Sequence, residues 1–397
     1  MNRFIILLRI LSMMVLMILV KFYPSMEEKE VTLIEEEYKT WKKNIKYLYD
    51  LLFTQSLKWP STSVQWFPEI ERENNSITRQ KVLLSTYTSQ QEPEHVIIGS
   101  FSFPDTFDHT PTSNAIGFSI THSMQVDVEI NVSRYCPQAS NIIALKTESK
   151  DVLIYDTTKH GSFSNDKQEP DAVLTGHADG GYAIDWNKNV FGQLISGGGD
   201  NQICLFDING GLISTYNKIH TDIINQVSYN AFNPNVFASV SDDMKLAITD
   251  TRTEAACHVI NNAHGSSIET VDYSPFKSEL VATAGSDNLV KIWDTRYLES
   301  PITILNGHAN DVMKVKWSPH YESILASSGK DRRVMIWDLN KSSEVDGDAS
   351  NELLFVHGGH TNTVPDFDWN PAEPIEICSI ADDCLLHVWK IPIEDFI

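Results

Sequence analysis

The chain has 397 residues, of which 42% are hydrophobic, and it carries a formal net charge of −22. This length and apolar content fit a folded protein with a sizeable core and exclude a chain that is disordered throughout. The acidic excess argues against direct DNA or RNA binding, and it favours cationic partners, although solubility alone would also account for it.

Residues 1–25 form an apolar leader, which is almost wholly apolar from Phe4 to Val20. Read literally, it is a signal anchor or a short transmembrane helix, because about 17–25 apolar residues can span a bilayer. No small-residue cleavage site follows, and Met26 opens an acidic stretch typical of the start of a soluble protein. We therefore favour a natural start at Met26 over a membrane-tethered protein.

Between residues 26 and 58, apolar side chains recur at helical spacing from Leu33 to about Ser56 and predict a long amphipathic helix. Thr62 to Phe67 then alternates like a β-strand. Two groups of strands are predicted next, within residues 80–125 and from Asp127 to Asp156.

The rest of the chain repeats one pattern five times, led by His177, His220, His264, His308 and His360. A Ser or Thr follows each histidine by nineteen residues and an Asp by twenty-three. A Trp follows by twenty-nine in the last three copies, whereas the first two copies have Phe or Thr there. Repeats of this period, with Gly-His near the start and Trp-Asp near the end, are typical of WD40 propeller blades.

Five such blades and the two preceding groups of strands predict an all-β fold, a seven-bladed WD40 propeller over residues 59–397 with an N-terminal helix. In a closed ring, the strand at Thr62 to Phe67 would complete the last blade.

The repeated side chains are the residue types of a catalytic triad, but five copies at one spacing favour five structural hydrogen-bond networks over five active sites. The complete networks are His264, Thr283, Asp287 and Trp293; His308, Ser327, Asp331 and Trp337; and His360, Ser379, Asp383 and Trp389. Phe206 and Thr249 replace Trp in the other two blades, which should depend more on packing.

Cysteine usage and motif spacing predict no metal and no cofactor. The five cysteines are an odd number without a Cys-x-x-Cys pair, so neither a zinc site nor a disulfide framework is indicated. Most are predicted to be reduced core thiols, as in cytosolic or nuclear proteins.

The polar, acidic insertion at 341–351 is either a tolerated loop or a binding element.

Four strings are more specific than the repeat: EEYKTWKKN at 36–44, RYCPQ at 134–138, WSPH at 317–320 and ELLFVHGGH at 352–360. They resemble the histone-binding WD-repeat family, which includes the retinoblastoma-binding histone chaperones and the WD-repeat subunit of type B histone acetyltransferase. The resemblance covers about residues 33–391, and its details look most like the fungal acetyltransferase subunits.

The resemblance implies a groove for a helix of histone H4, between the N-terminal helix and the acidic insertion. Its members on this chain would be Tyr47, Leu48, Leu51, Leu52, Phe355 and Val356 as the apolar floor, with Asp346 and Asp348 facing basic residues of the histone. An amphipathic helix in such a groove is physically reasonable, although the leucines would also serve to pin the N-terminal helix to the propeller. Ser350-Asn351 replaces two prolines of the animal chaperones, which should cost affinity because the loop is less preorganised.

The resemblance also implies an acidic channel face that takes an Arg- or Lys-rich peptide such as the histone H3 tail. The matching positions are Asp127, Glu129, Asn131, Tyr182, Asp311 and Asp382. Val132, Gly180, Asn225 and Thr363 replace charged residues of the animal proteins, so the tail specificity is expected to differ.

Taken together, the residues and the resemblance predict a non-catalytic histone-binding subunit of the nucleus and cytoplasm. It would present histone H4, with H3, to the catalytic subunit of a type B histone acetyltransferase. The same module in chromatin assembly factor 1 or in a deacetylase complex is the alternative. More distant alternatives are a membrane-anchored scaffold and a hydrolase built on one of the repeated His/Ser/Asp sets.

Overall fold

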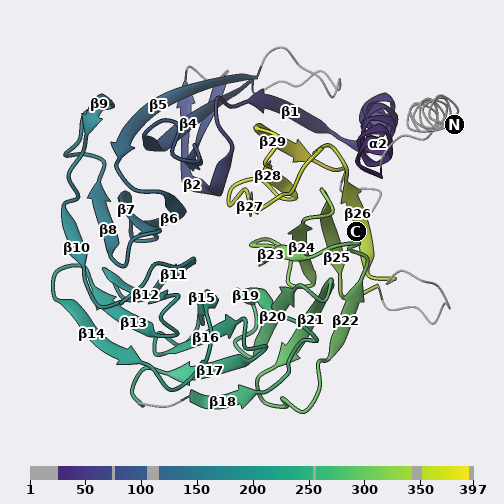
Figure 1. Cartoon of the computed structure of the whole chain (residues 1–397). Helices are drawn as coiled ribbons and strands as arrows, with labels where there is room; N and C mark the ends of the chain where they lie inside the picture. The colour runs from purple at the N-terminus through teal and green to yellow at the C-terminus, as the bar shows by residue number, and fades with distance from the viewer. Residues whose placement is uncertain (1–25, 74–76, 105–115, 254–255, 342–350, 393–397) are drawn as a thin grey trace, which may run out of the picture. The chain divides into compact units, whose positions relative to one another are not determined.

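The computed structural model describes residues 26–73, 77–104, 116–253, 256–341 and 351–392 (Figure 1). The chain divides into two compact units, Met1–Ile45 and Lys46–Ile397. Helix α2 (Met26–Leu48) fills the described part of the first unit, and the apolar leader lies outside the described residues. None of the helices in the described ranges has the length and apolar character needed to cross a membrane.

The second unit is a ring of seven sheets, which confirms the predicted seven-bladed propeller (Figure 1). Blade 1 contains β2 (Ser61–Glu73), β3 (Ile77–Thr86), β4 (Glu94–Pro104) and β5 (Gly117–Val126), and blade 2 contains β6 (Ile130–Cys136), β7 (Ala139–Thr147), β8 (Val152–Asp156) and β10 (Ala172–Leu174). Blade 3 contains β11 (Ala183–Trp186), β12 (Gln193–Gly197), β13 (Ile203–Asp207) and β14 (Gly211–Tyr216). Blade 4 contains β15 (Ile224–Tyr229), β16 (Val236–Ser241), β17 (Leu246–Asp250) and β18 (Ala256–Ile260).

The remaining three blades follow the same plan. Blade 5 contains β19 (Ile268–Tyr273), β20 (Leu280–Gly285), β21 (Leu289–Asp294) and β22 (Thr303–Asn306). Blade 6 contains β23 (Val312–Trp317), β24 (Ile324–Gly329), β25 (Val334–Asp338) and β26 (Leu353–His357). Blade 7 contains β27 (Asp366–Trp369), β28 (Glu376–Ile380), β29 (Leu385–Lys390) and, from the other end of the chain, β1 (Leu51–Ser56).

Strand β1 closes the ring, because it pairs antiparallel with β29 along its whole length. The prediction that the strand at Thr62 to Phe67 would do so was wrong, since those residues belong to β2 and lie inside blade 1. The helix also ends at Leu48 rather than near Ser56. The backbone groups of residues 51–56 bond to β29 instead of to one another, and this pairing covers the edge of β29 and makes β1 the outer strand of blade 7.

The connection between β8 and β10 of blade 2 contributes a further strand to blade 1. Within this insertion, which precedes His177, β9 (Phe163–Lys167) pairs parallel with β5 and becomes the fifth strand of the blade 1 sheet. The inserted segment therefore covers the outer edge of that sheet instead of forming an open loop.

The hydrophobic core lies between neighbouring blades. Where blade 7 meets blade 1, for example, Leu51 and Val388 pack in one cluster with Trp66 and Phe101. Buried carboxylates tie the innermost strands together: Asp185 accepts a hydrogen bond from the Tyr229 N–H at 2.7 Å. Asp272 and Asp368 accept equivalent bonds from a tryptophan backbone N–H of the next blade, at 2.9 and 2.8 Å. These bonds hold the inner strands at fixed positions around the channel.

Candidate functional site

The repeated histidine networks are closed to solvent. In blade 5, His264 contacts Asp287 at 2.9 Å and Thr283 at 2.8 Å, and the Trp293 indole N–H donates to Thr283 at 2.8 Å. Burial alone would raise the pKa of Asp287, but hydrogen bonds from His264 and from the Gly265 N–H outweigh it and lower that pKa. Because both ring nitrogens are engaged and the hydroxyl is fully buried, the set has no access to a substrate.

The other predicted networks are also assembled, with one difference. His308 contacts Asp331 at 2.9 Å and Ser327 at 2.7 Å, and Trp337 donates to Ser327 at 2.8 Å. In blade 7, His360 contacts Ser379 at 2.9 Å and Trp389 donates to Ser379 at 3.2 Å, but His360 Nδ1 lies 3.7 Å from Asp383. The last network is therefore looser at its carboxylate.

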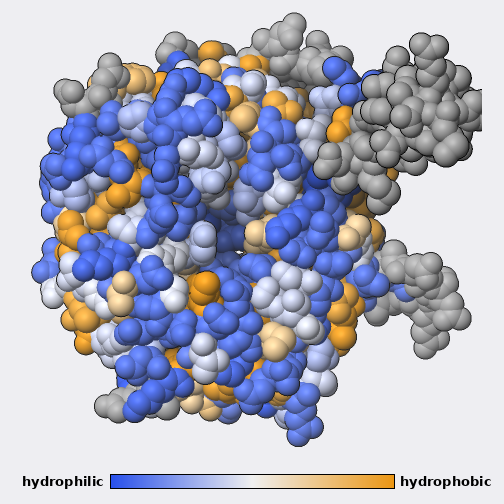
Figure 2. Space-filling view, viewed as in Figure 1, coloured by the Kyte–Doolittle hydropathy of each residue, from blue (hydrophilic) through white to orange (hydrophobic). Residues whose placement is uncertain are grey.

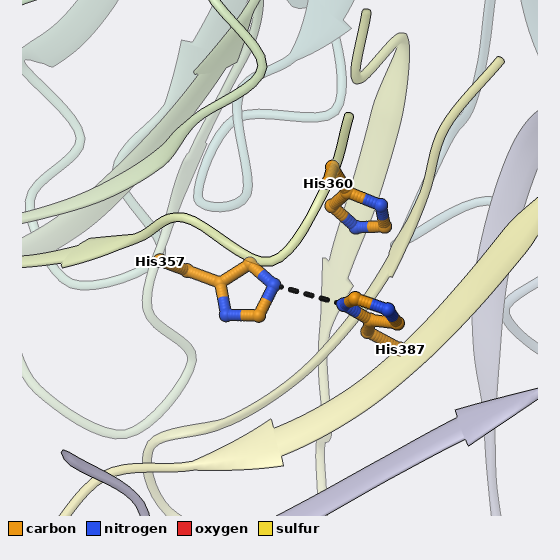
Figure 3. A group of neighbouring side chains, drawn as sticks. All are labelled: His357, His360 and His387. Carbon is orange, nitrogen blue, oxygen red and sulfur yellow. Dashed lines mark hydrogen bonds between the residues drawn. The ribbon is translucent and has the colours of Figure 1, made fainter. Parts of the chain in front are cut away.

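That looseness coincides with a buried cluster of three histidines, His357, His360 and His387 (Figure 3). His357 Nε2 lies 3.0 Å from His387 Nδ1, and the Tyr49 hydroxyl lies 2.8 Å from the other nitrogen of His357. Burial first, and then the neighbouring histidines, lower the pKa of His357 and His387 well below the usual value, so both rings are neutral. The cluster links β26, β29 and the segment that follows α2.

The arrangement of the rings does not fit a metal ion, although the three histidines offer nitrogens within 4.8 Å of one another. Ligand lone pairs lie in the ring planes and must converge on a point about 2 Å away. The rings of His360 and His387 are stacked at 4.2 Å and 17°, so their lone pairs run side by side. His360 Nε2 is moreover engaged with Ser379. The cluster is polar packing between two blades.

The residues predicted for the histone groove fall into two groups. Leu51 and Leu52, expected on the helix, lie in β1 and are 8% and 7% exposed, so the packing of blade 7 already uses them. Phe355 is also buried and contacts the rings of Tyr49 and Trp389.

The other group remains open to solvent. Tyr47 is 72% exposed and Val356 in β26 is 37% exposed, while Leu48 is half-buried. Asp346 and Asp348 lie outside the described residues. Tyr49 was not among the predicted residues, although its buried ring contacts Phe355 of β26 and Trp389 of β29.

At the channel, the structure brings four of the six predicted residues to one cavity of about 610 Å³: Glu129, Asn131, Tyr182 and Asp382. Asp127 lines an adjoining cavity of about 720 Å³, which it shares with Glu129. Asp311 lines neither cavity and instead pairs with Lys330 at 2.8 Å. Figure 2 shows hydrophilic side chains around the hollow at the centre of the ring on the face in view.

Further residues that line the 610 Å³ cavity were not predicted: Tyr87, Glu269, Met313 and Asp366. They come from different blades, and no sequence spacing relates them. Gly180 is one of the positions where the resemblance implied that a charged residue has been replaced. The structure gives a steric reason for glycine there, because a Cβ would lie 2.2 Å from the Glu148 carbonyl oxygen.

The electrostatics of the two cavities favour a cation. Burial and the nearby carboxylates of Glu148 and Glu94 raise the pKa of Glu129. Burial and Asp383 likewise raise the pKa of Asp382. Carboxylates that repel one another in this way are stabilised by a positively charged ligand. With the tyrosine ring of Tyr182 at 55% exposure beside them, the cavities are suited to Arg or Lys side chains.

The fold and these surfaces define a WD-repeat propeller that binds partners. Residues 36–105 match the family of the histone-binding protein RBBP4, or C subunit of the CAF1 complex, and residues 210–337 match the EIPR1 beta-propeller. The histone acetyltransferase type B subunit 2 of Encephalitozoon cuniculi is 47% identical over 377 residues, which cover 91% of this chain and 98% of that protein. The chain therefore belongs to the histone-binding WD-repeat family.

Proposed function

We propose that the chain is a non-catalytic histone-binding subunit that holds histone H4, together with H3, for the catalytic subunit of a type B histone acetyltransferase. The observation that carries this proposal is the acidic cavity that Glu129 and Asp382 line. Burial and neighbouring carboxylates raise the pKa of both residues, and a basic histone segment would offset the cost of their charge. The similarity to a type B acetyltransferase subunit supports the choice of complex.

In this function the chain contributes proximity rather than chemistry. A subunit that holds the histone near the active site of its partner raises the local concentration of the substrate. The closed histidine networks are consistent with this role. We propose that the protein acts in the nucleus and the cytoplasm.

A second candidate is the same module as the small subunit of chromatin assembly factor 1, which the match of residues 36–105 favours. Both candidates share the histone-binding surfaces and differ in the partner. Co-purification of the full chain with the catalytic acetyltransferase subunit, or with the larger subunits of the assembly factor, decides between them.

The groove is tested by measuring the affinity of the full chain for a histone H4 helix peptide. Val356→Asp is the informative variant, because Val356 is exposed and its replacement leaves the core intact. We expect it to weaken binding at least tenfold. Val173→Asp is the matched control, since Val173 is 47% exposed on β10 of another blade. Unchanged binding by Val356→Asp, with the fold intact by circular dichroism, would refute the groove.

A further inference from the structure

A third cavity, of about 310 Å³, occupies the channel and is lined by the innermost strands of all seven blades. It shares Arg134 and Lys314 with the acidic cavity, so the two spaces adjoin. Unlike its neighbour, it is rich in cations: its lining contains Arg134, Lys188, Lys314 and Lys316.

Two of these cations already have carboxylate partners. Arg134 donates to Asp366 at 3.0 Å, and Lys316 donates to Asp368 at 3.0 Å. Asp366 also accepts hydrogen bonds from the backbone N–H groups of Val64 and Phe367. Its oxygens are therefore occupied, and it has little capacity left for another cation.

Lys314 differs from these neighbours. It lies in β23, only 9% of its surface is exposed, and it lines both cavities. Among the described residues no hydrogen bond or ion pair reaches its amino group. Burial lowers the pKa of Lys314 to about 7, and although Asp366 opposes the shift, Arg134 and Lys316 add to it. A buried amino group without a partner is costly, and a bound anion would remove that cost.

The carboxylates of this cavity do not supply the missing partner. Asp185 and Asp272 each hold a backbone N–H of the next blade. Burial raises the pKa of both, which moves them toward the uncharged form. The electrostatic potential in the cavity is therefore more positive than it would be if all of its acidic side chains were charged.

We propose that the channel holds a small oxyanion, a carboxylate or a phosphate, on the amino group of Lys314, between the acidic cavity and the cationic one. The site borders the acidic cavity proposed for basic histone segments, because Lys314 lines both spaces. Because the ligand contacts the inner strands of several blades, it stabilises the closed ring.

The test compares thermal unfolding of the full chain in inorganic phosphate, in acetate and in chloride at equal ionic strength. For the parent protein we expect the midpoint to rise with the logarithm of phosphate or acetate concentration beyond its rise in chloride. Lys314→Gln should lose this extra rise, and Lys314→Arg should keep it. Lys330→Gln, which removes an exposed lysine of the same blade, should behave like the parent. The more effective anion identifies the ligand as phosphate-like or carboxylate-like.

A second measurement reports on the site itself and remains informative if Lys314→Gln does not fold. In NMR spectra of the full chain, the lysine ¹³Cε resonance that is absent from Lys314→Arg is assigned to Lys314. This resonance is followed while phosphate, acetate or chloride is added. Movement of this resonance with phosphate or acetate, but not with chloride, supports the site. Two results would overturn the proposal. In the first, the extra rise of the unfolding midpoint persists in Lys314→Gln, which would mean that phosphate stabilises the protein only by exclusion from its surface. In the second, none of the anions moves the Lys314 resonance.

Discussion

At the scale of one residue, Thr249 shows the consequence of replacing a blade tryptophan with a smaller polar side chain. It occupies the position that Trp293 holds in the next blade, and its hydroxyl is fully buried without a hydrogen-bond partner among the described residues. A buried hydroxyl of this kind costs more than an apolar group of the same shape. We therefore expect Thr249→Val to stabilise the protein by about 1 kcal/mol, measured as a shift of the guanidinium unfolding midpoint.

The neighbouring blade provides the matched control. Thr283 is equally buried, but its hydroxyl bonds to His264 and accepts from Trp293. Thr283→Val should therefore destabilise by about 1–3 kcal/mol, because it leaves two buried groups unsatisfied. If both substitutions shift the midpoint in the same direction, the hydroxyl of Thr249 is not the source of the difference.

At the level of elements, the propeller blades could be predicted because their sequence motif repeats. The strand by which the N-terminal part of the chain joins blade 7 could not be predicted. Apolar residues from Leu33 to Ser56 fit a helical period throughout, yet residues 51–56 form β1. Leu51 and Leu52 continue the helical period from Leu48, whereas Leu51 and Phe53 share a face only in a strand. Only the pairing with the distant β29 decides between the two. The local pattern carries no information about a partner at the far end of the chain.

The channel and the histidine cluster escaped prediction for a related reason. Glu129 and Asp382 were found through resemblance, while Glu269 and Met313, which line the same cavity, have no shared motif. His387 reads as one residue of an apolar strand, and only the packing of β26 against β29 places it beside His357.

This junction between β26 and β29 predicts a loss of stability in acid. The pKa values of His357 and His387 are depressed in the folded state, so below about pH 6.5 the unfolded chain binds protons that the folded chain does not. Stability should therefore fall as pH decreases from that value. Each histidine kept neutral costs about 2 kcal/mol at pH 5. The measurement is the free energy of unfolding between pH 7.5 and about pH 5.

His387→Gln isolates this contribution, since glutamine does not titrate. We expect a shallower fall of stability between pH 6.5 and about pH 5 than in the parent. His258→Gln replaces an exposed histidine of β18 and should leave the slope unchanged. Equal slopes in the parent and in His387→Gln would mean that the acid sensitivity has another origin.

At the scale of the whole molecule, the net charge of −22 and the acidic cavities should act together on a basic ligand. The overall charge acts over distance and governs the rate of association, whereas we expect Glu129 to contact the ligand and to govern its dissociation. We therefore expect the association rate of a histone H3 tail peptide to fall steeply from low salt to about 0.15 M, where the Debye length shrinks to about 8 Å.

Two single-charge variants separate these effects in stopped-flow and equilibrium measurements. Glu129→Gln should raise the dissociation rate several-fold and leave most of the salt dependence of association. Glu299→Gln removes the same charge from an exposed site of blade 5 that lines neither acidic cavity, and it should change neither rate appreciably. A peptide whose association is insensitive to salt would show that the acidic excess serves solubility alone. Equal dissociation rates in the two variants would move the binding site away from the cavities.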